Sequence, residues 1–274
     1  MNKLQALSSV TMFAVLAMLS ACGAGEPAPA ADANEGMAAS ETPARAAADN
    51  VIPTDSGDLI VQPIHHGSLM LAWNGTNILI DPAPAPGSDS QDPVAEYTAM
   101  DAPNLILVTD IHGDHMNADI LAAVSANATV VAPQAVADQL PEAVRSKTQV
   151  LANGETTTVA GVAIEAVPMY NISPDRLQYH EKGRGNGYVL TMGGKRIYVA
   201  GDTEDIPEMR ALQNIDAAFL PMNLPYTMTP EQSADAVREF RPAVVFPYHY
   251  GDSDVSSFQS MVGDASEVRL LGWY

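Results

Sequence analysis

The sequence predicts an α/β protein with α+β character, in which two packed β-sheets are flanked by helices. Strand-like apolar runs alternate with helix-like stretches along most of the chain, which is the usual pattern of such layered folds. Three of these strands end in residues that commonly ligate metals. The composition, 47% hydrophobic and 17% charged over 274 residues, is that of a globular protein. A layered fold with chemistry at its strand ends is therefore expected.

The first residues are typical of an export signal rather than of the fold. Lys3 precedes the apolar run Val10–Leu19, which is too short to cross a bilayer as a helix. Leu19-Ser20-Ala21-Cys22 follows, and it resembles the bacterial lipobox, in which the cysteine is lipidated. An ordinary cleaved signal beside a stray cysteine is the alternative. The resemblance implies a signal peptide over residues 1–21, lipidation of Cys22 and an exported lipoprotein that faces the periplasm, anchored in the outer membrane.

Residues 22–50 are rich in Ala, Pro, Glu, Asp, Ser and Gly and have almost no large apolar side chain. Such a segment cannot bury a core, so it predicts a disordered tether before a folded domain over residues 51–274. Cys22 is the only cysteine, which excludes disulfides within the chain and thiolate metal clusters.

The net charge restricts the partners. The chain has 33 Asp and Glu against 13 Lys and Arg, a formal charge of −20. Nucleic acid is excluded as a partner because its phosphates require clustered basic residues. Adhesion to anionic lipid is disfavoured for the same reason, which leaves the N-terminal lipid anchor as the only expected membrane contact. The expected partner is a small-molecule substrate, and an anionic one would have to be met by a metal ion or by a local basic loop.

The first half of the domain is expected to form a sheet. Three short apolar runs separated by glycine-containing turns predict a strand meander; they are 59–64, 69–73 and 77–80. The continuous apolar run 104–109 predicts a buried strand. Helices are expected over 118–125 and 134–140, with a strand over 129–132 between them.

The second half repeats this alternation. A strand is expected over 162–167, and Gly193-Gly194 joins two further strands, 187–192 and 195–200, in a hairpin. Runs 217–220 and 243–246 predict buried strands. Between them, Thr229-Pro-Glu-Gln232 predicts a helix start with an N-cap threonine and proline at the first helical position.

The strongest functional signal is the loop Thr109-Asp110-Ile111-His112-Gly113-Asp114-His115, between a strand and a helix. Imidazole and carboxylate groups are the ligands that bind a divalent metal when no thiolate is present. A strand-to-helix loop can direct several short side chains at one point. Because 2 of the 6 histidines lie here beside aspartates, a metal site is favoured over a solvated polar loop.

Two other strands are also followed by residues that can ligate a metal. Gly201-Asp202-Thr203 ends one of them, and His249, in Tyr248-His249-Tyr250, ends another. His249 alone would more often be a hydrogen-bonded core residue. Three strand ends that each carry metal-ligand residues indicate one shared site.

Four motifs follow one another along the chain: Leu-Ile-Asp-Pro (79–82), the Asp- and His-rich loop, Gly-Asp-Thr (201–203) and Tyr-His-Tyr (248–250). Their order resembles that of the metallo-β-lactamase superfamily, most closely its ascorbate-6-phosphate lactonase-like branch. The resemblance implies an αββα sandwich of two mixed sheets with a one- or two-metal site, usually zinc. It implies that Asp202 bridges the metals and that Asp114, His115 and His249 complete the second site. Asp81 would support the metal loop, and His66 would lie near the mouth of the site or form only a strand-end hydrogen bond.

Two departures from this family concern the first metal site. The usual loop reads His-x-His-x-Asp-His, and Asp110 replaces its first histidine. The third histidine should follow the strand 162–167, where Met169-Tyr170-Asn171 stands; His180 could substitute. The first site therefore retains His112 and Asp202, with Asp110 as a further candidate ligand. We expect one tightly bound Zn²⁺ and a second ion that is weak or absent, with Mn²⁺ or Fe²⁺ as alternatives because oxygen ligands favour harder ions.

The loop 179–187, Tyr-His-Glu-Lys-Gly-Arg-Gly-Asn-Gly, contains Lys182 and Arg184. It predicts either a clamp for a carboxylate or phosphate, with Arg184 as the binding residue, or a turn with solvated charges.

The predicted function is metal-dependent hydrolysis, in which a metal-bound water attacks an ester, lactone, amide or phosphodiester. Asp114 is the expected catalytic proton acceptor; Tyr170, Tyr226 and His180 are expected to contact substrate and could donate a proton. The alternative is a non-enzymatic periplasmic metal- or ligand-binding lipoprotein with a degenerate site. A true β-lactamase is disfavoured, because that activity generally goes with the intact histidine set.

Overall fold

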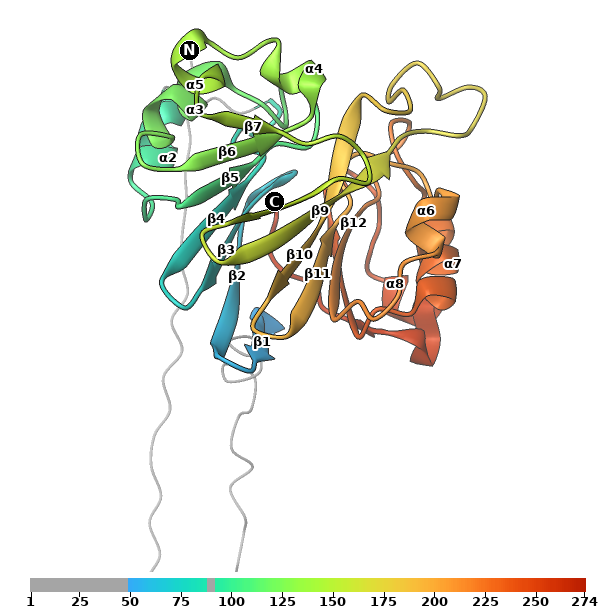
Figure 1. Cartoon of the computed structure of the whole chain (residues 1–274). Helices are drawn as coiled ribbons and strands as arrows, with labels where there is room; N and C mark the ends of the chain where they lie inside the picture. The colour runs from blue at the N-terminus through green and yellow to red at the C-terminus, as the bar shows by residue number, and fades with distance from the viewer. Residues whose placement is uncertain (1–48, 88–91) are drawn as a thin grey trace, which may run out of the picture. The chain divides into compact units, whose positions relative to one another are not determined.

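The computed structural model describes residues 49–87 and 92–274. The predicted signal peptide, Cys22 and residues 22–48 of the predicted tether lie outside the described residues. Within the described residues, two seven-stranded β-sheets pack face to face, and helices cover their outer faces (Figure 1). No helix among them is long and apolar enough to cross a membrane.

The first sheet has the order β1-β2-β3-β4-β5-β6-β7. Its first four strands form an antiparallel meander, and β5, β6 and β7 continue it in parallel. The strands are β1 (Val51–Thr54), β2 (Gly57–His65), β3 (Ser68–Trp73), β4 (Thr76–Ile80), β5 (Leu105–Leu107), β6 (Thr129–Ala132) and β7 (Thr148–Val150).

The second sheet has the order β14-β13-β12-β11-β10-β9-β8 and the same division into an antiparallel and a parallel part. The four strands β8 to β11 are antiparallel, and β12, β13 and β14 are added in parallel. The strands are β8 (Thr156–Val159), β9 (Val162–Met169), β10 (Gly185–Met192), β11 (Lys195–Val199), β12 (Ala217–Pro221), β13 (Val244–Tyr248) and β14 (Glu267–Val268).

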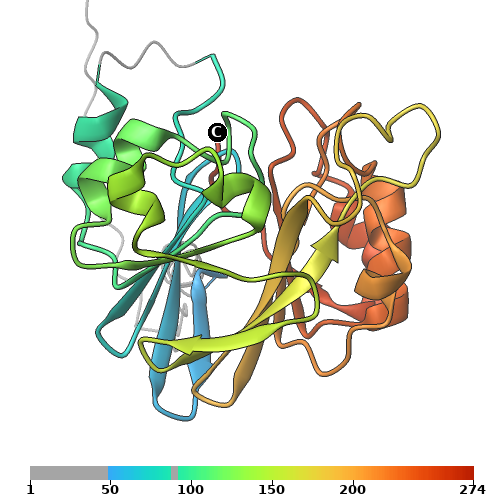
Figure 2. The same cartoon turned by 45° about the horizontal axis from the view of Figure 1, so that its top comes forward.

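The helices lie on the outer faces of the two sheets (Figure 2). Those on the first sheet are α2 (Pro93–Thr98), α3 (Ala118–Val124), α4 (Gln134–Ala137) and α5 (Glu142–Arg145); those on the second are α6 (Pro207–Arg210), α7 (Pro230–Phe240) and α8 (Phe258–Val262), which the 3-10 turn Gly263–Ala265 follows. In α7, Thr229 and Gln232 form the predicted capping box. Such a cap stabilises a helix by about 1 kcal/mol.

Side chains that alternate between the two faces of each strand explain the four layers, which are helices, sheet, sheet and helices. In β3, Leu69 and Leu71 join the core between the sheets, whereas Met70 packs under the helices of the first sheet. In β12, Phe219 likewise faces the inner core, whereas Leu220 packs under the helices of the second sheet. Because successive side chains point to opposite faces, strands that are apolar at every position need cover on both sides. The predicted αββα sandwich is confirmed.

Candidate metal centre

The functional side chains follow five parallel-paired strands. Asp81 follows β4, Asp110 follows β5, Asp202 follows β11, Asn223 follows β12 and His249 follows β13. The carboxyl ends of parallel strands meet at one edge of a sheet, which is where ligands bind in such folds. In this molecule, the edges of the two sheets contribute to the same site.

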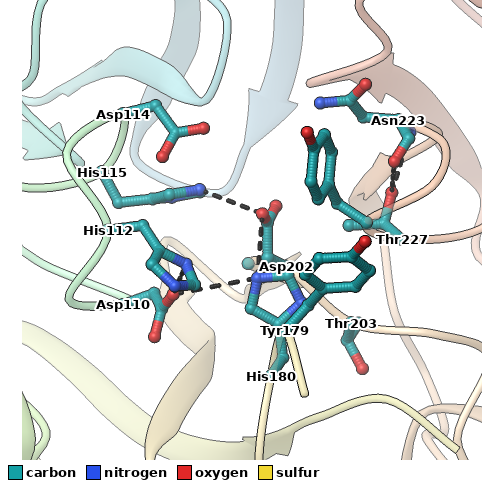
Figure 3. A network of polar contacts seen from close by, with 12 residues as sticks. Asp110, His112, Asp114, His115, Tyr179, His180, Asp202, Thr203, Asn223 and Thr227 are labelled. Carbon is teal, nitrogen blue, oxygen red and sulfur yellow. Dashed lines mark hydrogen bonds and ion pairs between the residues drawn. The ribbon is translucent and has the colours of Figure 1, made fainter. Parts of the chain in front are cut away.

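Four of the predicted ligands converge on one point. Each of Asp114, His115, Asp202 and His249 offers one donor atom, and these atoms all lie within 4.8 Å of one another. The Nε2 atoms of His115 and His249 are 3.1 Å apart. Oδ2 of Asp202 lies 3.3 Å from Nε2 of His115 (Figure 3), and Oδ2 of Asp114 lies 3.4 Å from Nε2 of His249.

The donor set fits a divalent cation. Oδ2 of Asp81 lies 2.8 Å from Nδ1 of His115, and Asp81 itself accepts hydrogen bonds from the backbone N–H and the hydroxyl of Thr109. Because Asp81 binds Nδ1–H, the lone pair on Nε2 of His115 points into the site. The buried Oδ1 of Asp202 makes no hydrogen bond. Facing imidazole nitrogens and a buried carboxylate oxygen that makes no hydrogen bond are what a cation would satisfy.

The site is strongly polarised. Burial alone would raise the pKa of Asp202, but the charges of His249 and His115 outweigh it and hold that pKa well below the usual range. Burial alone would lower the pKa of His115, but Asp202 and Asp81 outweigh it and raise that pKa well above its usual value. A cation that binds here must displace protons from imidazole, so its binding is coupled to proton release.

The backbone of the site is strained. His66, Asp81 and His249 have positive φ angles of 51°, 47° and 45°, a region that residues other than glycine rarely adopt. Gly67 lies so close to the two ligand histidines that an added Cβ would approach Cδ2 of His249 to 2.9 Å and Cε1 of His115 to 3.2 Å. Sequence reasoning missed Gly67. Its role becomes visible only in the structure, where His115 and His249, both distant in sequence, pack against it.

A second group of donors comprises Asp110, His112 and His180. Nδ1 of His112 lies 2.6 Å from Oδ2 of Asp110, and Nε2 of His180 lies 3.3 Å from Oδ2 of Asp202 (Figure 3). Asp202, a member of the first group, therefore also lies close to the second.

His180 reaches this group through a closed loop. Asn171, two residues after the end of β9, donates its backbone N–H to the carbonyl of His180 over 2.9 Å, and its side-chain amide donates to the carbonyl of Arg176. The chain thus leaves the end of β9 and returns to it, so His180 occupies the region where the family places a histidine directly after the strand. The prediction left the position of His180 open, and the structure brings its ring to the first site.

Arg184 has a partner within the protein. The prediction left open whether it clamps a substrate anion or is a solvated charge; its Nε and Nη2 atoms each lie 3.3 Å from an oxygen of Asp110, and Nη2 also donates to the carbonyl of Tyr179. Lys182 of the same loop pairs with Glu208 over 2.7 Å. Both charges are thus neutralised within the protein.

The site opens into a cavity of about 390 Å³. It is lined by His66, Pro86, His112, Asp114, Tyr179, His180, Asp202, Asn223, Tyr226 and His249. Tyr226 and His180 lie in it as predicted for substrate contacts. Tyr170 does not line it, because its hydroxyl donates to Glu208 over 2.8 Å, so its predicted role is not supported.

Three lining residues were missed by the sequence reasoning. Asn223 follows β12, between the strands that end in Asp202 and His249, so the strand-end argument could have found it. Tyr179 and Pro86 belong to loops, and no local pattern distinguished them. His66, expected near the mouth, is a buried residue that lines the cavity: its Nε2 lies 3.2 Å from Oδ2 of Asp114, and its Nδ1 lies 2.8 Å from the hydroxyl of Tyr274.

Two helix-covered mixed sheets, with imidazole and carboxylate donors at their strand ends, define the class of metallo-β-lactamase-fold hydrolases. A family model described as a β-lactamase superfamily domain matches residues 76–250, more than half of the chain. The chain belongs to this superfamily, and it is an enzyme of the metal-dependent hydrolase class.

Similar proteins agree with this assignment. A UPF0173 metal-dependent hydrolase of Nitratidesulfovibrio vulgaris is 35% identical over 223 residues, which cover 75% of this chain and 88% of that protein. Another, of Thermococcus onnurineus, is 36% identical over 177 residues, covering 61% and 78%. Among solved structures, a candidate metal-dependent hydrolase of Parabacteroides distasonis has 41% identity and a TM-score of 0.71, covering 80% of this chain and 96% of that one.

Proposed function

We propose that the protein is a zinc-dependent hydrolase that cleaves an ester, lactone, amide or phosphodiester bond. The observation that carries the proposal is the convergence of Asp114, His115, Asp202 and His249 at the floor of a cavity large enough for a small molecule. Two imidazole and two carboxylate donors suit zinc, and the absence of thiolate leaves Mn²⁺ and Fe²⁺ as alternatives.

A bound divalent cation supplies a Lewis acid, which lowers the pKa of a coordinated water and polarises the scissile bond. Asp114 is the proposed proton acceptor. Its side chain is 31% exposed, more than those of the other three donors, so it is the carboxylate that a reactant in the cavity can reach. Tyr226, on the wall of the cavity, is the proposed proton donor to the leaving group.

We propose one tightly bound ion per chain, held by this four-residue group. The group formed by Asp110, His112 and His180 has a guanidinium, that of Arg184, beside its only carboxylate. A positive charge at that distance opposes the binding of a cation. The first site is therefore proposed to bind its ion more weakly.

Two variants test the assignment. His115→Ala and His249→Ala should each abolish turnover of a panel of activated esters and lower the zinc content of protein purified without added metal. His65→Ala is the matched control, because the ring of His65 belongs to neither donor group and lies near Glu96. Normal zinc content with normal turnover in either ligand variant would refute the proposal.

We also propose that the protein is exported as a lipoprotein and faces the periplasm, on the strength of Leu19-Ser20-Ala21-Cys22 alone. The narrower resemblance to ascorbate-6-phosphate lactonase-like hydrolases stays a prediction. A panel that includes lactones with and without a phosphate group would test it.

A further inference from the structure

The basic side chains around the cavity are already neutralised by carboxylates of the protein. Arg184 pairs with Asp110, Lys182 with Glu208, and Arg176 with the buried Glu204 over 2.9 Å. These three are the basic residues of the segment that carries His180. Each is held by an internal partner, and a substrate anion would have to displace that partner.

The cavity wall itself contains no lysine or arginine among the described residues that line it. The four residues after Gly87 that lie outside the described ranges, Ser-Asp-Ser-Gln (88–91), include no basic residue either. One divalent cation would be balanced by the charges of Asp114 and Asp202, and Asp110 is balanced by Arg184. The site therefore has no surplus positive charge for an anion, and the chain around it has a net charge of −20.

Apolar side chains are exposed on the two segments that supply Tyr179 and Asn223 to the cavity wall. Among the described residues, seven large hydrophobic side chains are exposed, and four of them belong to the two segments that supply Tyr179 and Asn223 to the wall. They are Ile172 (46% exposed), Leu177 (49%), Leu224 (44%) and Tyr226 (44%). Of these four side chains, Tyr226 lines the cavity, and Ile172 and Leu177 line a neighbouring hollow that also includes His180.

The rings of Tyr179 and Tyr226 form an edge-to-face pair with centroids 5.0 Å apart. Both rings also line the cavity. Aromatic walls bind apolar groups through contact area and offer only a hydroxyl for polar contact. Together, the lack of free basic side chains and the aromatic wall indicate that the site excludes anions and accepts uncharged apolar groups.

We propose that the substrate is an uncharged carbonyl compound, an ester, lactone or amide, with an apolar acyl or aryl group that packs against Tyr179 and Tyr226. This inference rests on the proposed hydrolytic function and narrows it by excluding phosphodiesters and carboxylate-bearing substrates. The cavity, about 390 Å³, limits the part of the substrate that enters to a small molecule or one end of a larger one.

A matched pair of esters provides the first test. Para-nitrophenyl butyrate and mono-para-nitrophenyl succinate differ only in that a carboxylate replaces the terminal methyl group. At low ionic strength, kcat/KM should be at least about tenfold higher for the butyrate ester, and added salt should raise kcat/KM for the succinate ester alone by screening repulsion. Equal or faster turnover of the succinate ester overturns the inference and leaves the proposed hydrolase standing.

A charge-gain variant provides the second test. Tyr226→Arg places a cation at the cavity wall and also removes the proposed proton donor, which affects both esters because they share one leaving group. The expected effect of the new charge is therefore a higher ratio of kcat/KM for the succinate ester to kcat/KM for the butyrate ester. Val150→Arg is the matched control, because it adds the same charge at an exposed position of β7 that does not line the cavity. An unchanged ratio between the two esters in Tyr226→Arg overturns the inference.

Binding measurements that do not depend on turnover test the charge preference of the cavity separately from the proposed hydrolysis. Zinc-loaded protein should bind para-nitrobenzamide more tightly than para-nitrobenzoate in calorimetric titrations, and Tyr179→Ala should weaken the binding of the amide. If no ester or lactone is hydrolysed by zinc-loaded protein, the proposed function fails, and the amide–benzoate comparison still decides the charge preference of the cavity. Tighter binding of benzoate overturns the inference.

Discussion

Arg184 sets the electrostatic difference between the two donor groups. Its guanidinium lies against Asp110, whose side chain is fully buried. Burial alone would raise the pKa of Asp110, but hydrogen bonding to His112 and the nearby positive charges, that of Arg184 included, outweigh it and lower that pKa. Asp110 is therefore a charged carboxylate whose charge is already compensated, which weakens its attraction for a cation.

Arg184→Gln should raise the metal content of the protein from about one ion per chain toward two. Removing the guanidinium leaves Asp110 uncompensated beside His112 and His180, and a cation then relieves the buried charge. Lys182→Gln is the matched control, since it removes a charge from the same loop that pairs with Glu208. Mass-spectrometric metal analysis of both variants measures the effect, and equal metal content in the two would contradict the explanation.

Tyr274, the last residue of the chain, fixes the orientation of a ligand through His66. The ionised carboxylate of Asp114 can only accept, so Nε2 of His66 donates to it over 3.2 Å. Burial lowers the pKa of His66, and Nδ1 of the neutral ring then accepts from the Tyr274 hydroxyl over 2.8 Å, which itself accepts from the backbone N–H of Gly251 over 2.9 Å. The carboxylate of Asp114 therefore determines the direction of the whole series.

Tyr274→Phe should weaken zinc binding by roughly fivefold, because the loss of one such hydrogen bond costs about 1 kcal/mol. Competition with a chromophoric chelator measures the dissociation constant. Tyr250→Phe is the matched control, because the ring of Tyr250 packs on Tyr274 at 4.7 Å between centroids. In a His66→Ala background, Tyr274→Phe should have no further effect; a full fivefold loss there would show that Tyr274 acts by another route.

At the scale of elements, the segment from β9 to β10 is held by one buried carboxylate. Glu204 accepts hydrogen bonds from the backbone N–H groups of Ile172 and Ser173, each over 2.6 Å, and from Arg176 over 2.9 Å. These bonds organise the start of the loop that returns His180 to the metal centre.

Glu204→Gln should lower the Tm by roughly 6–12 °C. Removing a buried charge from its pair costs about 3 kcal/mol, and 1 kcal/mol corresponds to about 2–4 °C in a domain of this size. Glu208→Gln, which breaks the more exposed pair with Lys182, should change the Tm by less than about 3 °C. Calorimetry measures both, and an equally small effect of the two variants would mean that the loop is held by other contacts.

The elements that could be predicted from sequence are those with strong local signals. The capping box of α7 and the Gly193-Gly194 hairpin between β10 and β11 were expected and are present. The strands β1, β7, β8 and β14 were not predicted. All four lie at or next to a sheet edge and are short, and β8 is only half buried. Edge strands bury less apolar area and show weaker periodicity, so the sequence pattern there is faint.

At the scale of the whole molecule, the strongly acidic domain follows a segment with a lipobox-like motif and a low-hydrophobicity tether. Anionic lipid headgroups would repel a chain with a net charge of −20, so attachment to a membrane would depend on lipidation at Cys22.

Cys22→Ser should therefore move the protein from the membrane fraction to the soluble fraction of the cells, with the ester hydrolysis rate of the folded domain unchanged. Ser20→Ala is the control, since it alters the same motif but retains the thiol. Fractionation followed by immunodetection measures the distribution. If the Cys22 variant stays in the membrane fraction, the lipid-anchor proposal is wrong.

The sequence by itself determined the layered fold and the metal-ligand residues at three strand ends, through local signals: apolar runs of strand length, a cap, and ligand residues that follow strands. The superfamily, and the grouping of four of these residues in one site, came from the resemblance of the ordered motifs to a known family. Parallel strands necessarily bring their carboxyl ends together, so the positions of Asp202 and His249 directly after strands were enough to assign both to one site.

Only the tertiary structure decided the roles of His180, Arg184, Tyr170 and Gly67. The position of His180 depends on how a loop closes, and the pairing of Arg184 with Asp110 depends on which carboxylate lies within reach. The hydroxyl of Tyr170 faces Glu208 instead of the cavity, and Gly67 is required by two histidines far away in sequence. Contacts between residues distant along the chain leave no periodicity or spacing in the sequence, because they arise only when the sheets have packed.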